Sequence, residues 1–285
     1  TSTVSQATPH PGVGPALKSD FSEVDDYARI VHQSIFAGEE STWTYIDEKG
    51  EEKIFNERRV YSADPTFLTV FSFPLIYGQP QTALSDESSV LISESTAKKF
   101  FGEVDPRGKI LVMNGNRSLT VTGVFKDVPE NSHIKFDILV CYFLLQIPTF
   151  LSAEGYWKWA EYDTYVLLKP DIDPGSLESR FDPFVERHMG EYMKRMNYIE
   201  HFHLQPLTDI HLRSPEMIKE REVHGSALTV NILMIIAVLI LVIAWTNYIN
   251  LSTSKSIERA REVGVRKVSG ATRRTLIGQF LFETA

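Results

Sequence analysis

The sequence has a single cysteine, Cys141, among its 285 residues. One thiol cannot form a disulfide within the chain, and cysteine-based zinc sites need several ligands, so both kinds of framework are excluded. Basic residues are in the minority, with 29 Lys and Arg against 37 Asp and Glu. The resulting net charge of −8 argues against general nucleic-acid binding, which requires a basic surface. Hydrophobic residues make up 43% of the chain, so a folded core is expected rather than a disordered tail.

Motifs for catalysis are also lacking: the sequence has no HExxH, no GxSxG and no convincing nucleophile beside a base. Residues 102–109 contain two glycines and a lysine, but their spacing is wrong for a phosphate-binding loop. His201 and His203 share a face of a predicted strand and could bind a metal with His188 or His211, although surface or packing roles are favoured. We therefore expect no catalytic residue, no cofactor and no metal site.

Charged residues are missing altogether from residues 228–254. The apolar run 228–249 is 22 residues long, or about 33 Å as a helix at about 1.5 Å per residue. That length covers a hydrocarbon core of about 30 Å, and Trp245 and Tyr248 near one end suit a membrane interface. The alternative is a buried helix of a soluble protein, but such helices rarely run this long without a charge. We expect a transmembrane helix.

The flanks of this span predict its orientation. Residues 255–285 carry seven basic and three acidic side chains, whereas residues 1–227 are strongly acidic. Because basic residues beside a span mark the cytoplasmic side, residues 1–227 are expected outside the cytoplasm. The first 15 residues are polar and lack the apolar core of a signal peptide, so we expect this chain to follow directly after an earlier span.

Residues 1–227 show the pattern of an α+β domain that is expected to be two-lobed. Asn114-Gly115 separates two apolar runs and predicts a hairpin. Ser93 predicts the cap of a short helix over residues 94–101, which Gly102 ends. Further helices are predicted after Asp64-Pro65 and after Asp173-Pro174, the second of them kinked or broken at Pro183. Residues 162–169 and 199–204 are predicted strands, and Gly123 is expected at a strand irregularity.

The segment after the span is basic yet patterned. Ile257, Ala260 and Val263 continue a helical spacing out of the membrane, and Gly264 and Gly270 permit bends or close approach to another surface. This pattern suits a short helix that lies at the membrane surface and docks a cytoplasmic partner. A basic flank held by anionic lipid headgroups explains it equally well. From Leu276 apolar residues return, as if a further span began.

Several motifs, in order, resemble the permease subunit of a MacB/FtsX-type ABC transporter. Residues 261–271 (REVGVRKVSGA) resemble the family's cytoplasmic coupling helix, and residues 279–283 (QFLFE) resemble the start of its third span. The remaining motifs are similar to the family's periplasmic core signature: residues 63–65 (ADP), 71–75 (FSFPL), 89–102 (SVLISESTAKKFFG), 105–109 (DPRGK), 121–133 (VTGVFKDVPENSH) and 204–212 (LQPLTDIHL).

The resemblance implies a bacterial inner-membrane protein with residues 1–227 in the periplasm as a MacB-like core domain. It implies that residues 228–254 are the transmembrane helix and that residues 255–285 begin an FtsX-like domain, with 255–275 in the cytoplasm. It implies a dimer with a second permease copy in the lipid bilayer, an ABC ATPase on a separate subunit or domain, and a periplasmic adaptor or cargo. The full family pattern has four spans, of which three are lacking here, as are Walker motifs.

The resemblance also implies a mechanism, in which ATPase movement passes through coupling helices to the periplasmic domains. The cargo would be a peptide, lipoprotein or antibiotic. The residues that match the coupling helix, and are expected to contact the ATPase, are Arg261, Glu262, Gly264, Arg266, Lys267 and Gly270. A substrate-binding residue cannot be assigned.

A second function from another class is a signalling receptor, in which an extracytoplasmic sensor domain on a membrane helix controls a cytoplasmic module. Such a receptor would continue its span into coiled-coil heptads or a two-helix linker. The glycine-interrupted residues 262–272 followed by renewed hydrophobicity favour the permease. Two further spans and an associated ATPase would distinguish the two.

Overall fold

The computed structural model of the chain describes residues 4–142, 157–214, 225–270 and 272. The chain divides into two compact units, Thr1–His224 and Gly225–Ala285. Each unit is described by itself below.

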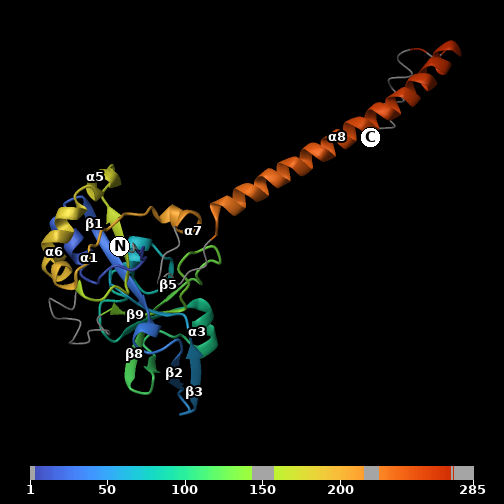
Figure 1. The fold of residues 1–285 in the computed structure, drawn as a ribbon. Helices are drawn as coiled ribbons and strands as arrows, with labels where there is room; N and C mark the ends of the chain where they lie inside the picture. The colour runs from blue at the N-terminus through green and yellow to red at the C-terminus, as the bar shows by residue number, and fades with distance from the viewer. Residues whose placement is uncertain (1–3, 143–156, 215–224, 271, 273–285) are drawn as a thin grey trace. The chain divides into compact units, whose positions relative to one another are not determined.

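The first unit is built on a ten-stranded mixed sheet (Figure 1). The strand order is β10-β1-β4-β9-β6-β8-β7-β2-β3, and β5 pairs with β8 beside this path. Two neighbouring pairs, β4 with β9 and β6 with β8, are parallel, and the others are antiparallel. The strands are β1 Val24–His32, β2 Ser41–Ile46, β3 Glu52–Glu57, β4 Val60–Ala63, β5 Leu75–Tyr77, β6 Ser89–Ser93, β7 Ile110–Met113, β8 Arg117–Phe125, β9 Ile138–Cys141 and β10 Asp163–Leu168.

Both faces of the sheet are covered. Successive side chains of the central strands point to opposite faces, so each strand supplies apolar side chains to two hydrophobic cores. In β6, Val90 and Ile92 belong to one core, which also holds Phe100 of helix α3 (Glu94–Phe101). Leu91 points to the other core, which holds Phe67 of helix α2 (Phe67–Phe71). A strand buried on both faces has no polar alternation, which is why all of β6 is apolar or small.

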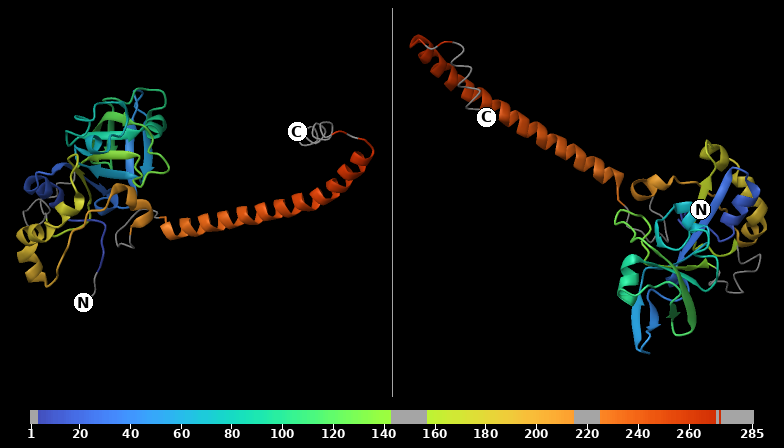
Figure 2. Two further views of the ribbon diagram at one scale, coloured as in Figure 1. Left: turned by 90° about the horizontal axis from the view of Figure 1, so that it is seen from above. Right: turned by 180° about the vertical axis from the view of Figure 1, so that it is seen from behind.

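A third core lies between the β1–β10 end of the sheet and helices α1 (Val13–Asp20), α5 (Pro174–Glu178) and α6 (Phe181–Met196). The blue and yellow helices lie side by side in both views of Figure 2. The first unit, Thr1–His224, is one compact unit on one continuous sheet, so the expected two lobes are not shown as separate units. Shorter elements are η1 (Gln33–Ile35), η4 (Leu207–Asp209) and α7 (Ile210–Arg213).

Most local predictions for this unit are confirmed. Asn114 and Gly115 have positive φ angles of 49° and 71° in the turn between β7 and β8. The Ser93 hydroxyl accepts a hydrogen bond from the Thr96 amide at 3.2 Å, and Gly102 ends α3 with φ +63°. Gly123 lies where the β6–β8 register shifts, and a Cβ there would be 2.7 Å from both the Tyr77 carbonyl oxygen and Leu91 Cδ2.

Two predictions need correction. Residues 199–204 form no strand, because polar side chains bind this segment instead of a neighbouring strand. The Glu178 carboxylate accepts the Leu204 amide at 3.0 Å and lies 2.8 Å from His203 Nδ1. The helix after Asp173 is broken between α5 and α6, before Pro183. Pro183 lies in the first turn of α6, where its missing N–H removes no helical hydrogen bond.

Candidate functional site

The second unit contains one continuous helix, α8 (Ala227–Val268), of 42 residues (Figure 1). It begins at Ser226, whose hydroxyl accepts the Thr229 amide at 3.3 Å. At about 1.5 Å per residue the helix is about 63 Å long, roughly twice the thickness of a hydrocarbon core. Among the described residues it is the one helix long and apolar enough to cross a membrane.

The uncharged part of α8 satisfies several of its hydroxyl groups internally. Thr246 and Thr253 each donate to the carbonyl four residues earlier, at 2.8 Å in both cases. Hydroxyls bonded in this way do not need water, so they are compatible with a lipid environment. Large apolar side chains along the same stretch, such as Leu241 and Ile243, are more than half exposed. This composition and exposure are what a lipid-facing helix requires.

The helix continues without interruption past the last uncharged residue. Residues 255–268 extend α8 rather than forming a separate helix, so the expected short surface helix is not shown within the described residues. Gly264 stays within the helix, so α8 is not interrupted there, and close approach of another surface at this glycine stays a prediction. Gly270 does end the helix, with φ +95° and its amide 3.2 Å from the Lys267 carbonyl oxygen. Residues 273–285, including the predicted start of a further span, lie outside the described residues.

The predicted contact residues lie together on the last turns of α8 but on different sides of it. Arg261 and Gly264 share a face with Ile257 and Val268, since a spacing of four, three and four residues follows one side of a helix. Glu262 and Arg266 lie on the opposite, charged face. Lys267 lies between the two faces, and Gly270 follows the helix end. The six residues therefore do not form one face of the helix.

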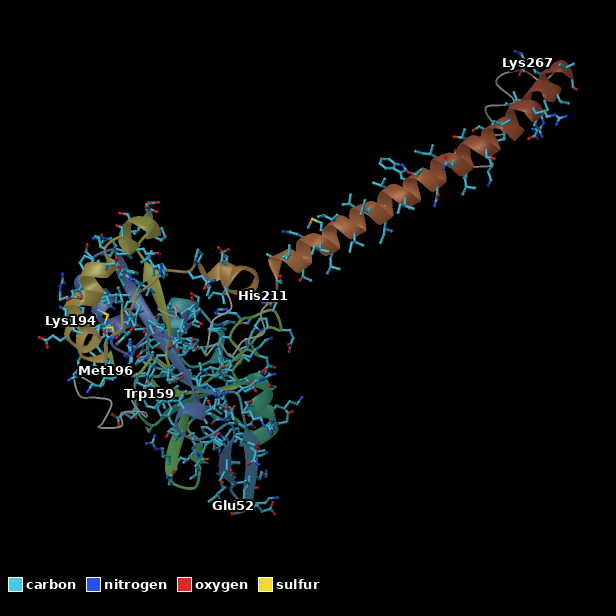
Figure 3. All side chains as sticks on the ribbon, in the orientation of Figure 1. Glu52, Trp159, Lys194, Met196, His211 and Lys267 are labelled. Atoms are coloured by element: carbon cyan, nitrogen blue, oxygen red, sulfur yellow. The ribbon has the colours of Figure 1, made fainter. Side chains whose placement is uncertain are left out.

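The charged face is organised by an ion pair. Arg266 donates to the Glu262 carboxylate, one helical turn earlier. Lys255 and Arg259 lie on the same face at the same spacing, and the predicted contact residues do not include them. The spacing of four, three and four residues places Lys255, Arg259, Glu262 and Arg266 on one side of the helix. Arg266 and Lys267 also lie at the helix C-terminus, where positive charge interacts favourably with the helix dipole. Figure 3 labels Lys267 at this end.

The histidines considered as metal ligands bind carboxylates instead. His201 Nδ1 lies 2.7 Å from Asp182, and His188 Nε2 lies 2.9 Å from Asp20. His188 lies on α6, His201 lies in the segment that follows α6, and His211 lies on α7. Within the described ranges no three potential metal ligands converge.

Comparison with known proteins identifies both units. Residues 3–184 match the family model of the MacB-like periplasmic core domain, and residues 234–285 match the FtsX-like permease C-terminal model. The first match ends inside α6, and the second begins inside α8.

Individual relatives agree with these matches. The macrolide export ATP-binding/permease protein MacB of Agrobacterium fabrum is 26% identical over 76% of this chain and 31% of its own length. A probable export ATP-binding/permease protein of Pseudomonas fluorescens is 27% identical over 68% of this chain and 27% of its own length. The chain thus spans less than a third of either relative.

A solved structure resembles the first unit. A domain of a protein described as a permease, from Porphyromonas gingivalis, superposes with a TM-score of 0.53 at 30% identity, covering 64% of this chain and 78% of that one. With the core-domain match over more than half of its length and the permease match beyond it, the chain belongs to the MacB/FtsX-type family of ABC transporter permeases.

Proposed function

We propose that this chain is the force-transmitting part of an ABC transporter permease, with residues 1–227 in the periplasm and 228–254 across the inner membrane. The observation that carries the proposal is the unbroken course of α8 from the uncharged segment into the charged end. A single helix resists bending better than two helices joined by a loop. Movement applied at residues 255–268 would therefore reach the extracytoplasmic end of the span.

The partner at the charged end would be an ABC ATPase on a separate subunit or domain. Arg261, Glu262, Gly264, Arg266, Lys267 and Gly270 would form the contact, joined by Lys255 and Arg259 on the charged face. The chain itself would be non-catalytic. ATP-driven closure of the ATPase dimer would push on this end, and a second permease copy would provide the matching helix on the other side.

The cargo would be a peptide, lipoprotein or antibiotic that is exported or extracted on the periplasmic side, with or without an adaptor. Among the described residues the span carries no charged side chain that could line a polar path through the bilayer. This composition supports work on the periplasmic face rather than passage of cargo along α8.

Charge reversal at the helix end tests the proposal. Arg266→Glu with Lys267→Glu, in the full-length permease reconstituted with its ATPase in lipid nanodiscs, should abolish most permease-stimulated ATP hydrolysis and weaken ATPase binding. Lys194→Glu is a matched control, because Lys194 is an exposed lysine of α6 in the first unit (Figure 3). Unchanged binding and stimulation in the double variant would show that this end of α8 is not the ATPase contact.

A further inference from the structure

Strand β3 lies at one end of the sheet, and among the described residues it pairs with β2 alone. The backbone amide of Asp47 donates to the Glu51 carbonyl at 3.0 Å, so these two residues form a hydrogen-bonded pair at the start of the hairpin. Such pairs alternate with non-bonded pairs along an antiparallel ladder. Counting from Asp47–Glu51, the pairs Tyr45–Lys53 and Trp43–Phe55 are also hydrogen-bonded pairs. The backbone N–H and C=O groups of Lys53 and Phe55 therefore point toward β2.

The intervening residues of β3 direct their backbone N–H and C=O groups away from the sheet. In the part of the chain that the structure describes, the backbone amides of Glu52, Ile54 and Asn56 have no backbone partner. A six-residue strand is about 20 Å long, enough to pair with a short extended peptide. Figure 3 shows Glu52 at the outer tip of the hairpin. The residues with outward backbone groups are Glu52, Ile54 and Asn56.

A groove of about 540 Å³ lies beside this open edge, between β3 and the last turn of α3. Its floor is aromatic, because Phe55 stacks on Phe100 with ring centroids 4.2 Å apart. An open strand edge beside a helix provides backbone hydrogen bonds along the edge and a groove for alternate side chains, as strand addition requires. The groove is lined by Lys53, Ile54, Phe55, Lys98, Lys99, Phe100, Phe101 and Gly102.

The charge of the groove is of one sign. Its lining has three lysines and no acidic residue. Lys99 is held by Glu57 at 2.6 Å, and Lys53 lies 3.6 Å from Asp47. Lys98 is exposed in the last turn of α3 and takes part in no ion pair within the described ranges. An incoming carboxylate would meet Lys98 without displacing an existing partner.

From this juxtaposition we infer that the β3 edge binds an extended acidic peptide segment of a partner protein by strand addition. The peptide pairs its backbone with Glu52, Ile54 and Asn56. Its alternate side chains enter the groove, where apolar groups contact the aromatic floor and carboxylates approach Lys98. The inference is independent of the function proposed for α8, since it concerns the first unit only.

A second copy of the chain is the less favourable occupant. Pairing β3 with itself around Ile54 would place Glu51 of one copy beside Glu57 of the other. Like charges on directly opposed strand positions destabilise the pair.

The test uses the full chain in detergent micelles and two fluorescently labelled ten-residue peptides. One peptide alternates valine with glutamate, and the other alternates valine with lysine. Fluorescence anisotropy should detect binding of the glutamate peptide and at least tenfold weaker binding of the lysine peptide. Light scattering of the same samples reports the mass of the complex.

Two variants separate backbone pairing from side-chain contact. Ile54→Pro removes an outward N–H that β2 does not use, and proline is tolerated on edge strands in this position. It should weaken binding about tenfold or more, as expected for a lost hydrogen bond and a blocked strand pairing. The matched Ile54→Ala variant keeps the N–H and should bind within about twofold of the unchanged chain. Lys98→Glu should reverse the preference between the two peptides.

Retained binding in Ile54→Pro, with near-ultraviolet circular dichroism unchanged, would overturn strand addition. Equal binding of the two peptides would overturn the acidic partner. A dimer that Ile54→Pro dissolves, in a chain that binds neither peptide, would show that a second copy occupies the edge and would likewise overturn the inference.

Discussion

Arg29 and Asp64 form a two-pronged ion pair inside the first unit, with both guanidinium–carboxylate distances at 2.8 Å. Each residue is about 5% exposed or less, and the Arg29 backbone amide donates to the same carboxylate. Burial alone would lower the pKa of Arg29, but the hydrogen bonds and charge of Asp64 raise it above its ordinary value. The pair joins β1 to the start of the α2 segment, so it fixes how two parts of the sheet and its helical cover meet.

Asp64→Ala should lower the free energy of unfolding by about 3–5 kcal/mol, because it leaves a buried guanidinium without its partner. Thermal melting of the full chain in detergent, followed by near-ultraviolet circular dichroism, measures the loss. Asp105→Ala is the control: it breaks an exposed ion pair with Arg107, in which both side chains are more than half exposed. The control should melt like the unchanged chain, and equal losses in the two variants would contradict this account of the buried pair.

Acid should destabilise the first unit through His133. Burial lowers the pKa of His133, whose Nε2 lies 3.3 Å from the Tyr165 hydroxyl. In the unfolded chain this histidine takes up a proton near its ordinary pKa of about 6.5. In the folded chain its pKa is lower, so it stays neutral until the pH falls further. Stability contributed by the neutral form is therefore present above pH about 6.5 and is lost as the pH falls from there to the lower folded pKa.

His133→Phe should remove this part of the acid dependence while keeping an aromatic ring against Tyr165. The measurement compares melting temperatures of the two chains between pH 5 and pH 7.5. His201→Gln serves as the control, since the His201 side chain lies after the end of α6 and is 58% exposed, so its loss should change the melting temperatures little. Parallel curves for His133→Phe and the unchanged chain would show that another group controls the acid loss.

Gly123→Val should disrupt the packing of β8 against β5 and β6. A Cβ at Gly123 would lie 2.7 Å from a backbone carbonyl oxygen of Tyr77, which cannot rotate away. Overpacking of this kind costs about 1–3 kcal/mol. Thr120→Val places a valine at a half-buried position of the same strand, where it changes the side-chain volume little, and should cost less. Thermal melting ranks the two, and an equal or smaller loss at Gly123 would contradict the close approach.

The continuity of α8 can be tested without changing a charge. Ser256→Pro removes the helical hydrogen bond to residue 252 and kinks the helix just past the uncharged segment. In the full-length permease with its ATPase, it should reduce permease-stimulated ATP hydrolysis while ATPase binding persists. Ser256→Ala removes only the hydroxyl bond to the Ser252 carbonyl at 2.7 Å, and should retain stimulation. Full stimulation in the proline variant would contradict transmission through a rigid α8.

Local sequence signals predicted the structure correctly where the conformation depends on residues close by in the sequence. The Asn114-Gly115 turn, the Ser93 cap and the helical conformation of the uncharged segment depend on nearby residues, and each was predicted correctly. Residues 199–204 were predicted wrongly as a strand because their conformation depends on Glu178 and Asp182, which lie about 20 residues earlier in the sequence. Propensity cannot detect carboxylates that replace a neighbouring strand.

The same distinction applies to the candidate site. The contact residues between Arg261 and Gly270 were predicted through the resemblance to the coupling helix and stay a prediction. Their distribution around α8 could be described only once the helix was seen to continue to Val268. The Arg29–Asp64 pair and the open edge of β3 were not predicted, because both depend on strand order, which a single sequence does not reveal. The sequence alone predicted the α+β class but not the order of the ten strands.

The length of α8 also gives it the properties of a lever. For a rigid rod of about 63 Å, a tilt of about 5° moves the far end by about 5 Å, which exceeds the spacing between neighbouring β-strands. A tilt of a few degrees about one end would therefore displace the other end by about one strand spacing. The length of the helix alone would produce this displacement, without the movement of another element.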